Sequence, residues 1–464
     1  MKKQYKYVLA TIACLGSLIS CEKGFLDEKP SSTIITPSTL SDYKNLLDNY
    51  SVVNVTGALP QLSADDYDYT NQAALNSVAT NTARNAYLWR ADIYQGERNI
   101  QDWNGPYQAI FYANSVIDGI TKIPRDIGNA SEWDNLMGWA LFVRAYEYFD
   151  LVRNFSPAYE EASAAANLGV PIRLSPGIDI LLQRASQKET YERILLDLNT
   201  AKLLLNGKVQ ANNRNRPSAA AVSGLLSRIY LSMRMYDLAS FYAEECLATY
   251  STIIDYNTVS TTARTPFSYN NDETIYSSVQ VAAFSGATSN NTSTSIYVNK
   301  ELIASYQSND LRLPIFFAKN TAGNYNKKRG YAGEASYPFT GIATDEIILN
   351  LAECKARKGD PQGAMTLLNS LLVKRWNNKV VFTPLKANDG AEALKQILNE
   401  RRKELVWRGL RWTDIKRLNV EGRNIALTRN INNEVYTLNP NDPKYVFPIP
   451  DDEILLSGIT QNTR

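Results

Sequence analysis

A missing residue type limits the possible chemistry most strongly. The chain of 464 residues contains no histidine. Ser-His-Asp and Cys-His nucleophile systems, imidazole general bases and histidine-ligated zinc or iron are therefore excluded. Carboxylate chemistry stays open, because the chain carries 47 Asp and Glu residues and a glycosidase needs only two acids at a suitable distance. No such pair is visible in the sequence, and we assign no catalytic residue.

The densest group of polar and aromatic residues is Asp65-Asp66-Tyr67-Asp68-Tyr69. Three carboxylates beside two phenols could bind calcium or the hydroxyl groups of a sugar. A solvated surface turn is the alternative. We predict no bound metal and no cofactor, and we expect ligand contacts from seven residues in loop-like segments. These are Asp65, Asp66, Tyr67, Tyr69, Trp89, Tyr94 and Tyr297.

Aromatic residues are abundant, with 28 tyrosines, 7 tryptophans and 13 phenylalanines. In polar loops such rings form wide, rigid platforms for carbohydrates and peptides. The longest irregular region is 251–343, which is rich in Ser, Thr, Asn and Gly and contains strand-like runs at 274–281 and 295–298. Because long loops on a rigid body are often functional, we expect exposed rings there. The candidates are Phe284, Tyr297, Tyr306, Tyr325 and Tyr331.

The N-terminus predicts the compartment. Residues 1–20 combine a basic start with a short apolar run, as in a signal peptide. Leu18-Ile19-Ser20-Cys21 resembles a bacterial lipobox, in which the cysteine is acylated. We therefore predict lipidation at Cys21, membrane attachment through acyl chains, and a polar tether over 21–40. Cys246 and Cys354 are expected to be buried, unpaired thiols.

The elements that carry these residues are mainly helical. Apolar residues recur at helical spacing over 41–50, 103–114, 133–153, 186–206, 217–233, 236–250, 344–358 and 361–376. Alanines at crossing points and a Gly359-Asp360 corner are typical of tetratricopeptide repeats. The predicted fold over 41–464 is a mainly α scaffold of such hairpins, with long loop-rich insertions and a few short strands. Residues 51–99 are predicted to be loop-rich.

A cationic helical segment spans 392–419, and Gly409 is expected to divide it into two helices. Its arginines and lysines could form a surface for phosphate or nucleic acid. The preferred interpretation is structural, with Trp407 and Trp412 buried and the cations bound to carboxylates and carbonyls elsewhere in the fold. A formal net charge of only +2 also argues against nucleic acid as the main partner.

Several segments resemble the SusD/RagB family of surface lipoproteins. The resemblance rests on ERRKEL…RGLRWTDIKR within 392–419, on YVFPIP…QN at 445–462, on the Trp103 to Asn114 pattern, and on the run Ala140, Arg144, Ala145, Phe149 and Leu151. It departs at Arg408, where many members carry glutamate. The Asp310-x-Arg312 pair also resembles a family segment and is taken as structural. The C-terminal signature spans about 392–462.

The resemblance implies a binding protein in the outer membrane that faces the cell exterior. It would take a glycan or oligosaccharide and deliver it to a SusC-like TonB-dependent transporter. A peptide ligand, as in RagB-like capture, is one alternative. A carboxylate-dependent glycoside hydrolase and a pure interaction scaffold are others.

Overall fold

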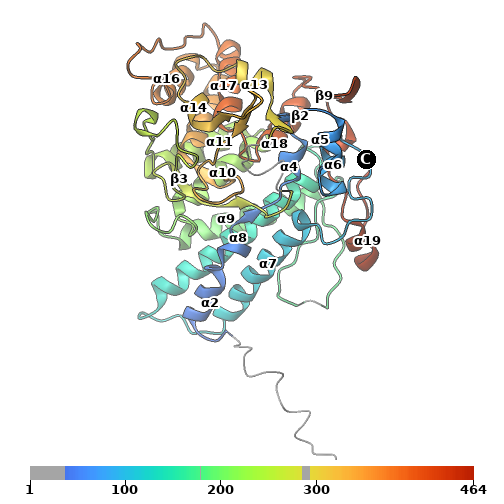
Figure 1. Cartoon of the computed structure of the whole chain (residues 1–464). Helices are drawn as coiled ribbons and strands as arrows, with labels where there is room; N and C mark the ends of the chain where they lie inside the picture. Colours follow the sequence, from blue (N-terminus) through green and yellow to red (C-terminus); the bar gives the residue numbers. More distant parts are fainter. Residues whose placement is uncertain (1–36, 178, 285–292) are drawn as a thin grey trace, which may run out of the picture. The chain divides into compact units, whose positions relative to one another are not determined.

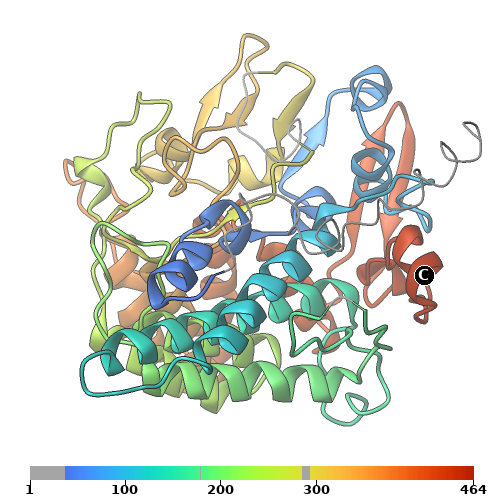
Figure 2. The same cartoon turned by 90° about the horizontal axis from the view of Figure 1, so that it is seen from below.

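Helices form most of the regular secondary structure, and the longer ones pack against one another (Figure 1). The predicted mainly helical scaffold is confirmed. The first long helices are α7 (Gln101–Ile120), α8 (Ala130–Phe155) and α9 (Gln187–Leu204), and α8 packs against both neighbours. Figure 2 shows these three helices side by side in teal and green. The next pairs are α10 (Ala219–Ser232) with α11 (Tyr236–Thr249), and α15 (Thr344–Arg357) with α16 (Pro361–Leu372).

The computed structural model describes residues 37–177, 179–284 and 293–464. Within it, Thr39–Arg464 form one compact unit. The signal peptide 1–20, the lipidation residue Cys21 and most of the tether 21–40 lie outside the described residues and stay predictions. No helix among the described residues is both long and apolar enough to cross a bilayer.

Side-chain caps fix where several helices begin. Ser186 accepts a hydrogen bond from the Glu189 backbone N–H, and the Glu189 carboxylate accepts one from the Ser186 N–H in return, which starts α9. Ser218, directly after Pro217, accepts from the Ala221 N–H and starts α10. Asp360 does the same for α16 through the Gly363 N–H. These local signals explain why the predicted helical segments have nearly the observed bounds.

The predicted loop-rich segment 51–99 contains short helices, so that prediction is wrong in part. Its elements are α3 (Tyr50–Val53), β1 (Val55–Thr56), α4 (Leu59–Ser63), β2 (Tyr67–Tyr69), α5 (Gln72–Asn76) and α6 (Asn81–Tyr87), after α2 (Leu40–Leu47). Asn71 and Thr80 cap α5 and α6. Helices α3 to α6 have 4 to 7 residues each, which is at most two turns. Such short helices show no apolar periodicity in the sequence.

The insertion 251–343 carries short strands, as predicted. Its elements are η3 (Tyr256–Thr258), β3 (Thr274–Tyr276), β4 (Val279–Gln280), β5 (Ile296–Val298), α13 (Lys300–Ala304), α14 (Arg312–Phe316), β6 (Phe317–Lys319), β7 (Tyr325–Lys327) and β8 (Ile342–Ala343). Strand β4 pairs with β1 in parallel, and β5 pairs with β2 antiparallel. These two pairings join the insertion to the N-terminal segment. The pairs β3–β8 and β6–β7 lie within the insertion.

The C-terminal signature forms α17 (Gly390–Glu404) and α18 (Arg411–Val420). Gly409 separates them with a left-handed φ of 65°, as predicted. A hairpin of β9 (Leu427–Ile431) and β10 (Glu434–Leu438) and the turn η4 (Pro443–Tyr445) follow. The tail also contains the short helix α19 (Asp451–Ser457). Three acidic residues in its first turn favour this helix.

The structural interpretation of the cationic signature is confirmed. Trp407 and Trp412 are buried. Arg417 binds the Glu353 carboxylate at 2.6 and 2.8 Å, and Lys416 Nζ donates to two backbone carbonyls at 2.7 and 2.8 Å. Charge-assisted contacts of this kind hold helices together. The cations that make them already have internal partners and are not free to bind phosphate. Arg312 likewise binds Asp310 internally, as expected, and Cys246 and Cys354 are buried free thiols.

Candidate ligand-binding site

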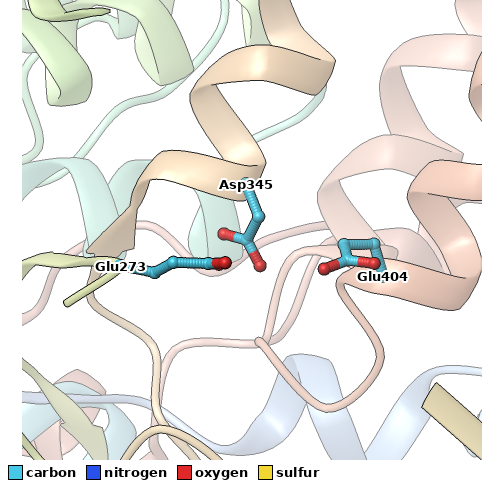
Figure 3. Close-up of side chains that lie close together, drawn as sticks. All are labelled: Glu273, Asp345 and Glu404. Carbon is cyan, nitrogen blue, oxygen red and sulfur yellow. The ribbon is translucent and has the colours of Figure 1, made fainter. Parts of the chain in front are cut away.

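Three buried acids offer the arrangement nearest to a metal or catalytic site. Glu273 directly precedes β3, Asp345 lies in the first turn of α15, and Glu404 ends α17. Figure 3 shows their carboxylates converging, and one oxygen of each lies within 4.8 Å of the others. Their side chains are fully buried. A glycosidase acid must reach its substrate, and these acids have no access to one.

Arginines already neutralise this carboxylate cluster. Arg375 donates to Glu273 at 2.8 Å and to Glu404 at 2.8 Å. Arg408 donates to Asp345 at 2.7 Å. Burial, together with the neighbouring Glu273, raises the pKa of Asp345 to about 7 although Arg408 lowers it. The guanidinium groups occupy the positions a cation would need, so the cluster is a structural charge network.

Arg408 is the residue at which the chain departs from the resemblance that the sequence suggested. Its guanidinium carbon lies 4.2 Å from the Tyr331 ring centroid and 5.0 Å from that of Phe339. It therefore combines an ion pair to Asp345 with stacking on two rings. A glutamate here would add a fourth acid to the cluster.

Most of the predicted ligand-binding rings are buried. Tyr67 has an exposed fraction of 0%, Trp89 2% and Tyr94 1%, and Tyr69 is buried as well. Tyr67, Tyr69 and Tyr87 pack together with ring centroids 4.8–5.8 Å apart. The prediction that these rings form an exposed platform is wrong. They fill the interior where 51–99 meets the rest of the fold.

A buried cation explains why these rings gather in the interior. The Arg429 guanidinium lies 4.2 Å from the Tyr87 ring centroid, 5.1 Å from that of Trp89 and 5.4 Å from that of Tyr67. It also donates to the Tyr67 carbonyl at 2.7 Å and to the Ala64 carbonyl. Cation–π contact and two carbonyls together replace the hydration that Arg429 loses. We call Tyr67, Tyr69, Tyr87, Trp89 and Arg429 the buried ring cluster.

Two of the acids beside this cluster, Asp65 and Asp66, have separate partners. The third, Asp68, binds Arg429 of the cluster at 3.3 Å. Asp65 binds Arg411 through both oxygens, at 2.7 and 2.9 Å, and Arg402 at 2.9 Å. Burial opposes its charge, but these two arginines outweigh burial and hold the pKa of Asp65 well below its usual range. Asp66 is buried, and Gln61 donates to it at 3.1 Å. The segment is therefore not the solvated turn considered above.

Tyr297 is the predicted ring that keeps an exposed face. It lies half-buried in β5, directly opposite Asp68 of β2. Lys300 Nζ lies 5.4 Å from its ring centroid. Burial and the nearby Asp68 raise the pKa of Tyr297, so its hydroxyl stays protonated and able to donate a hydrogen bond.

A second half-exposed ring lies on the neighbouring strand. Tyr325 of β7 is half-buried, and Lys319 Nζ, across the β6–β7 hairpin, lies 5.5 Å from its ring centroid. The Asn326 side chain donates to the Ile296 carbonyl at 2.8 Å and joins β7 to β5. Asp68, Tyr297, Lys300, Lys319 and Tyr325 define what we call the strand face.

The strand face corrects and extends the sequence prediction. Among the rings expected to be exposed in 251–343, Phe284, Tyr297 and Tyr325 are half-buried, whereas Tyr306 and Tyr331 are buried. Sequence reasoning missed Lys300 and Lys319. The sequence did contain a signal for both lysines. Lys300 follows Tyr297 by three residues, and Lys319 precedes Tyr325 in a segment that forms a hairpin. Two rings flanked by cations and a carboxylate can stack on a sugar ring and bind its hydroxyls.

Family models match both halves of this helical scaffold. Residues 24–231 match a family model described as starch-binding and associating with the outer membrane, and residues 250–463 match the model of the SusD family. The two matches are consecutive and together span most of the sequence. The chain belongs to the SusD/RagB family, as its sequence motifs indicated.

Solved structures with the same fold agree with this assignment. A SusD superfamily protein from Bacteroides thetaiotaomicron VPI-5482 has a TM-score of 0.72 and 20% identity, covering 92% of this chain and 100% of the other. A SusD-like carbohydrate binding protein from Bacteroides vulgatus ATCC 8482 has a TM-score of 0.66 and 20% identity, covering 91% and 97%. A laminarin binding SusD-like protein has a TM-score of 0.65 and 18% identity, covering 91% and 98%. A search of curated proteins gives no match.

Proposed function

We propose that the protein captures a glycan or oligosaccharide on the strand face, outside the cell, without altering it. The observation that carries this proposal is the pair of half-exposed tyrosines, Tyr297 and Tyr325, on adjoining strands, each with a lysine over its ring. Membership in the SusD family supports it, as does the neighbour whose name describes it as laminarin binding.

The chemistry of capture follows from the side chains. Pyranose rings present C–H groups on one face, which pack on a tyrosine ring, and hydroxyls at the rim, which need donors and acceptors. Asp68 accepts hydrogen bonds, and the lysines donate them. The Tyr297 hydroxyl adds both functions.

Delivery and anchoring belong to the same proposal. A thioether-linked lipid at Cys21 would hold the protein at the outer membrane, and a SusC-like TonB-dependent transporter would receive the glycan. Support comes from the lipobox-like sequence before Cys21 and from the family's association with the outer membrane. Fractionation of Cys21→Ala cells tests the anchor, because the variant should leave the membrane fraction.

The binding test is calorimetry of the chain starting at Glu22 against a panel of neutral and acidic oligosaccharides and short peptides. Tyr297→Ala and Tyr325→Ala should each weaken the binding of the best ligand about fivefold, since a ring contact contributes on the order of 1 kcal/mol. Tyr50→Ala is the matched control, because Tyr50 has an exposed fraction of 67% and lies in α3. Equal affinity of all four proteins contradicts the proposal.

The same panel separates the alternatives. A peptide that binds while every glycan fails would favour the peptide-capture function. Release of shortened products, abolished by one Asp or Glu substitution, would identify a hydrolase. The capture proposal predicts that each oligosaccharide is recovered intact.

A further inference from the structure

A cavity with an aromatic wall lies away from the strand face. It has a volume of about 610 Å³ and is bounded by the end of α16, the segment that follows it, α17, and residues around Asp310. It shares no residue with the strand face. Its volume falls within the range of about 300–1,000 Å³ that is common for small-molecule sites.

One wall of this cavity is aromatic and held in place. Trp376 and Phe382 contact each other edge to face, with ring centroids 5.9 Å apart, and both are half-buried. The Asn377 N–H donates to the Asn309 carbonyl at 3.0 Å. Leu385 exchanges two hydrogen bonds with the Asn369 side chain, at 2.8 and 2.9 Å. The wall is thus pre-organised although the segment has no regular structure.

The floor of the cavity is polar and internally balanced in charge. Arg312 binds Asp310 at 2.7 Å and Glu400 at 2.6 Å, and Lys403 binds Glu400 at 2.5 Å. In the floor, two cations therefore face two carboxylates.

Arg375 also lines the cavity and binds Glu273 and Glu404 outside it. These ion pairs compensate the charges of the floor, and Lys386 at the rim is a cation without an ion-pair partner among the described residues. Neutral hydroxyls can both donate to the acids and accept from the cations.

The rim adds polar groups that the fold does not use. The side chains of Gln307, Thr383 and Lys386 line the cavity and have no protein partner among the residues that the structure describes. An aromatic wall, a balanced polar floor and unused rim groups together match the surface of a pyranose: apolar on one face, rich in hydroxyls at its edge.

We propose that the Trp376 cavity is a second binding site for a short neutral oligosaccharide. The inference rests on the proposed function, since both sites would take the same class of ligand. Two separate sites on one chain would raise the retention of a long glycan, because binding at one site increases the local concentration at the other.

The test titrates the chain from Glu22 with neutral di- and hexasaccharides of glucose, galactose, mannose and xylose. The wild type should bind two equivalents of disaccharide, and Trp376→Ala should bind one. Tyr297→Ala should bind one equivalent with the wild-type affinity and the other about fivefold more weakly. Trp376→Phe keeps an aromatic wall and should retain both sites. Val381→Ala is the matched control, because Val381 has an exposed fraction of 88% in the same segment and does not line the cavity.

Circular dichroism of each variant separates lost binding from lost folding, and Phe382→Ala provides an independent probe of the same wall. Two equivalents bound to Trp376→Ala overturn the second site and leave the proposed function standing. If the wild type binds only one equivalent and Tyr297→Ala weakens it, the second site is likewise overturned and the proposed function stands. Absence of binding to any saccharide overturns both. Equal binding of a glucuronate disaccharide overturns the preference for a neutral ligand.

Discussion

Two groups of aromatic residues come from the same kind of sequence and have opposite surroundings. The rings of the buried ring cluster and of the strand face lie mostly in short elements within polar segments rich in tyrosine. In the first, Arg429 lies inside the group and the rings are buried. In the second, Lys300 and Lys319 lie over rings that keep an exposed face. The position of the cation distinguishes a structural ring from a candidate ligand platform.

The difference follows from solvation. An arginine can be buried because its planar guanidinium stacks on rings and donates to carbonyls in several directions, as Arg429 does. An ammonium group is more strongly hydrated, and those of the exposed residues Lys300 and Lys319 can exchange water for a ligand hydroxyl. The buried ring cluster should therefore govern stability, and the strand face should govern binding.

The largest expected effect is on stability. Arg429→Met removes the cation from the buried ring cluster and leaves the Tyr67 and Ala64 carbonyls without their donors. We expect a loss of about 3–5 kcal/mol in the free energy of unfolding, measured by chemical denaturation. Arg423→Met is the control, since Arg423 is exposed, and it should change stability by less than about 0.5 kcal/mol. If Arg429→Met changed the free energy of unfolding by less than about 1 kcal/mol, the buried ring cluster would not govern stability.

A smaller effect depends on pH. Asp65 has a lowered pKa in the folded protein, so it contributes stability above its ordinary pKa of about 4 and loses it as pH falls toward the folded value. Asp65→Asn should be less stable than the wild type by about 2 kcal/mol at pH 7, with a difference that shrinks below pH about 4. Asp118→Asn, which removes an exposed partner of Lys122, should show almost no such difference. If the stability difference between Asp65→Asn and the wild type grows as the pH falls, the pKa of Asp65 is not lowered in the folded protein.

Removing single hydroxyls sharpens the comparison further. Tyr67→Phe loses a hydrogen bond of 2.9 Å to the Leu62 carbonyl and should reduce stability by about 1 kcal/mol without changing glycan affinity. Tyr297→Phe should leave stability unchanged and weaken binding only two- to threefold, roughly, because the stacking ring remains. Denaturation and calorimetry on the same preparations measure both quantities. If Tyr67→Phe instead weakened glycan binding and Tyr297→Phe reduced stability, Tyr67 would be the ligand contact and Tyr297 the structural residue.

The smallest effect concerns the lysines of the strand face. Lys300→Gln keeps a donor but removes the charge over Tyr297, and we expect about a twofold loss of affinity for a neutral glycan. Added salt should change that affinity little, because an uncharged ligand is not screened. Strong salt dependence would point to an acidic ligand instead.

The helical scaffold was largely predictable, and the reasons are local. Apolar residues at helical spacing located α7 to α11 and α15 to α17, and Gly409 marked the break before α18. Helices α4 to α6 were missed because they are too short to show a period. The β9–β10 hairpin was also missed, although Asn432 and Asn433, both with positive φ, form a turn that favours a hairpin.

The candidate site was predictable only in part, because burial depends on distant partners. Arg429 follows Tyr67 by 362 residues, and nothing near Tyr67 in the sequence shows that this arginine will cover its ring. Tyr94 is buried for a similar reason, since its hydroxyl donates to the Pro448 carbonyl at 2.8 Å. Tyr297 keeps its exposed face in a short strand that leaves one side of the chain uncovered.

A crystal structure of the chain with its tightest-binding oligosaccharide would show directly whether the strand face binds the glycan. We predict a pyranose ring in van der Waals contact, within about 4 Å, of the Tyr297 or Tyr325 ring, with sugar hydroxyls near Asp68 or Lys300. A bound sugar that touches neither tyrosine would contradict it.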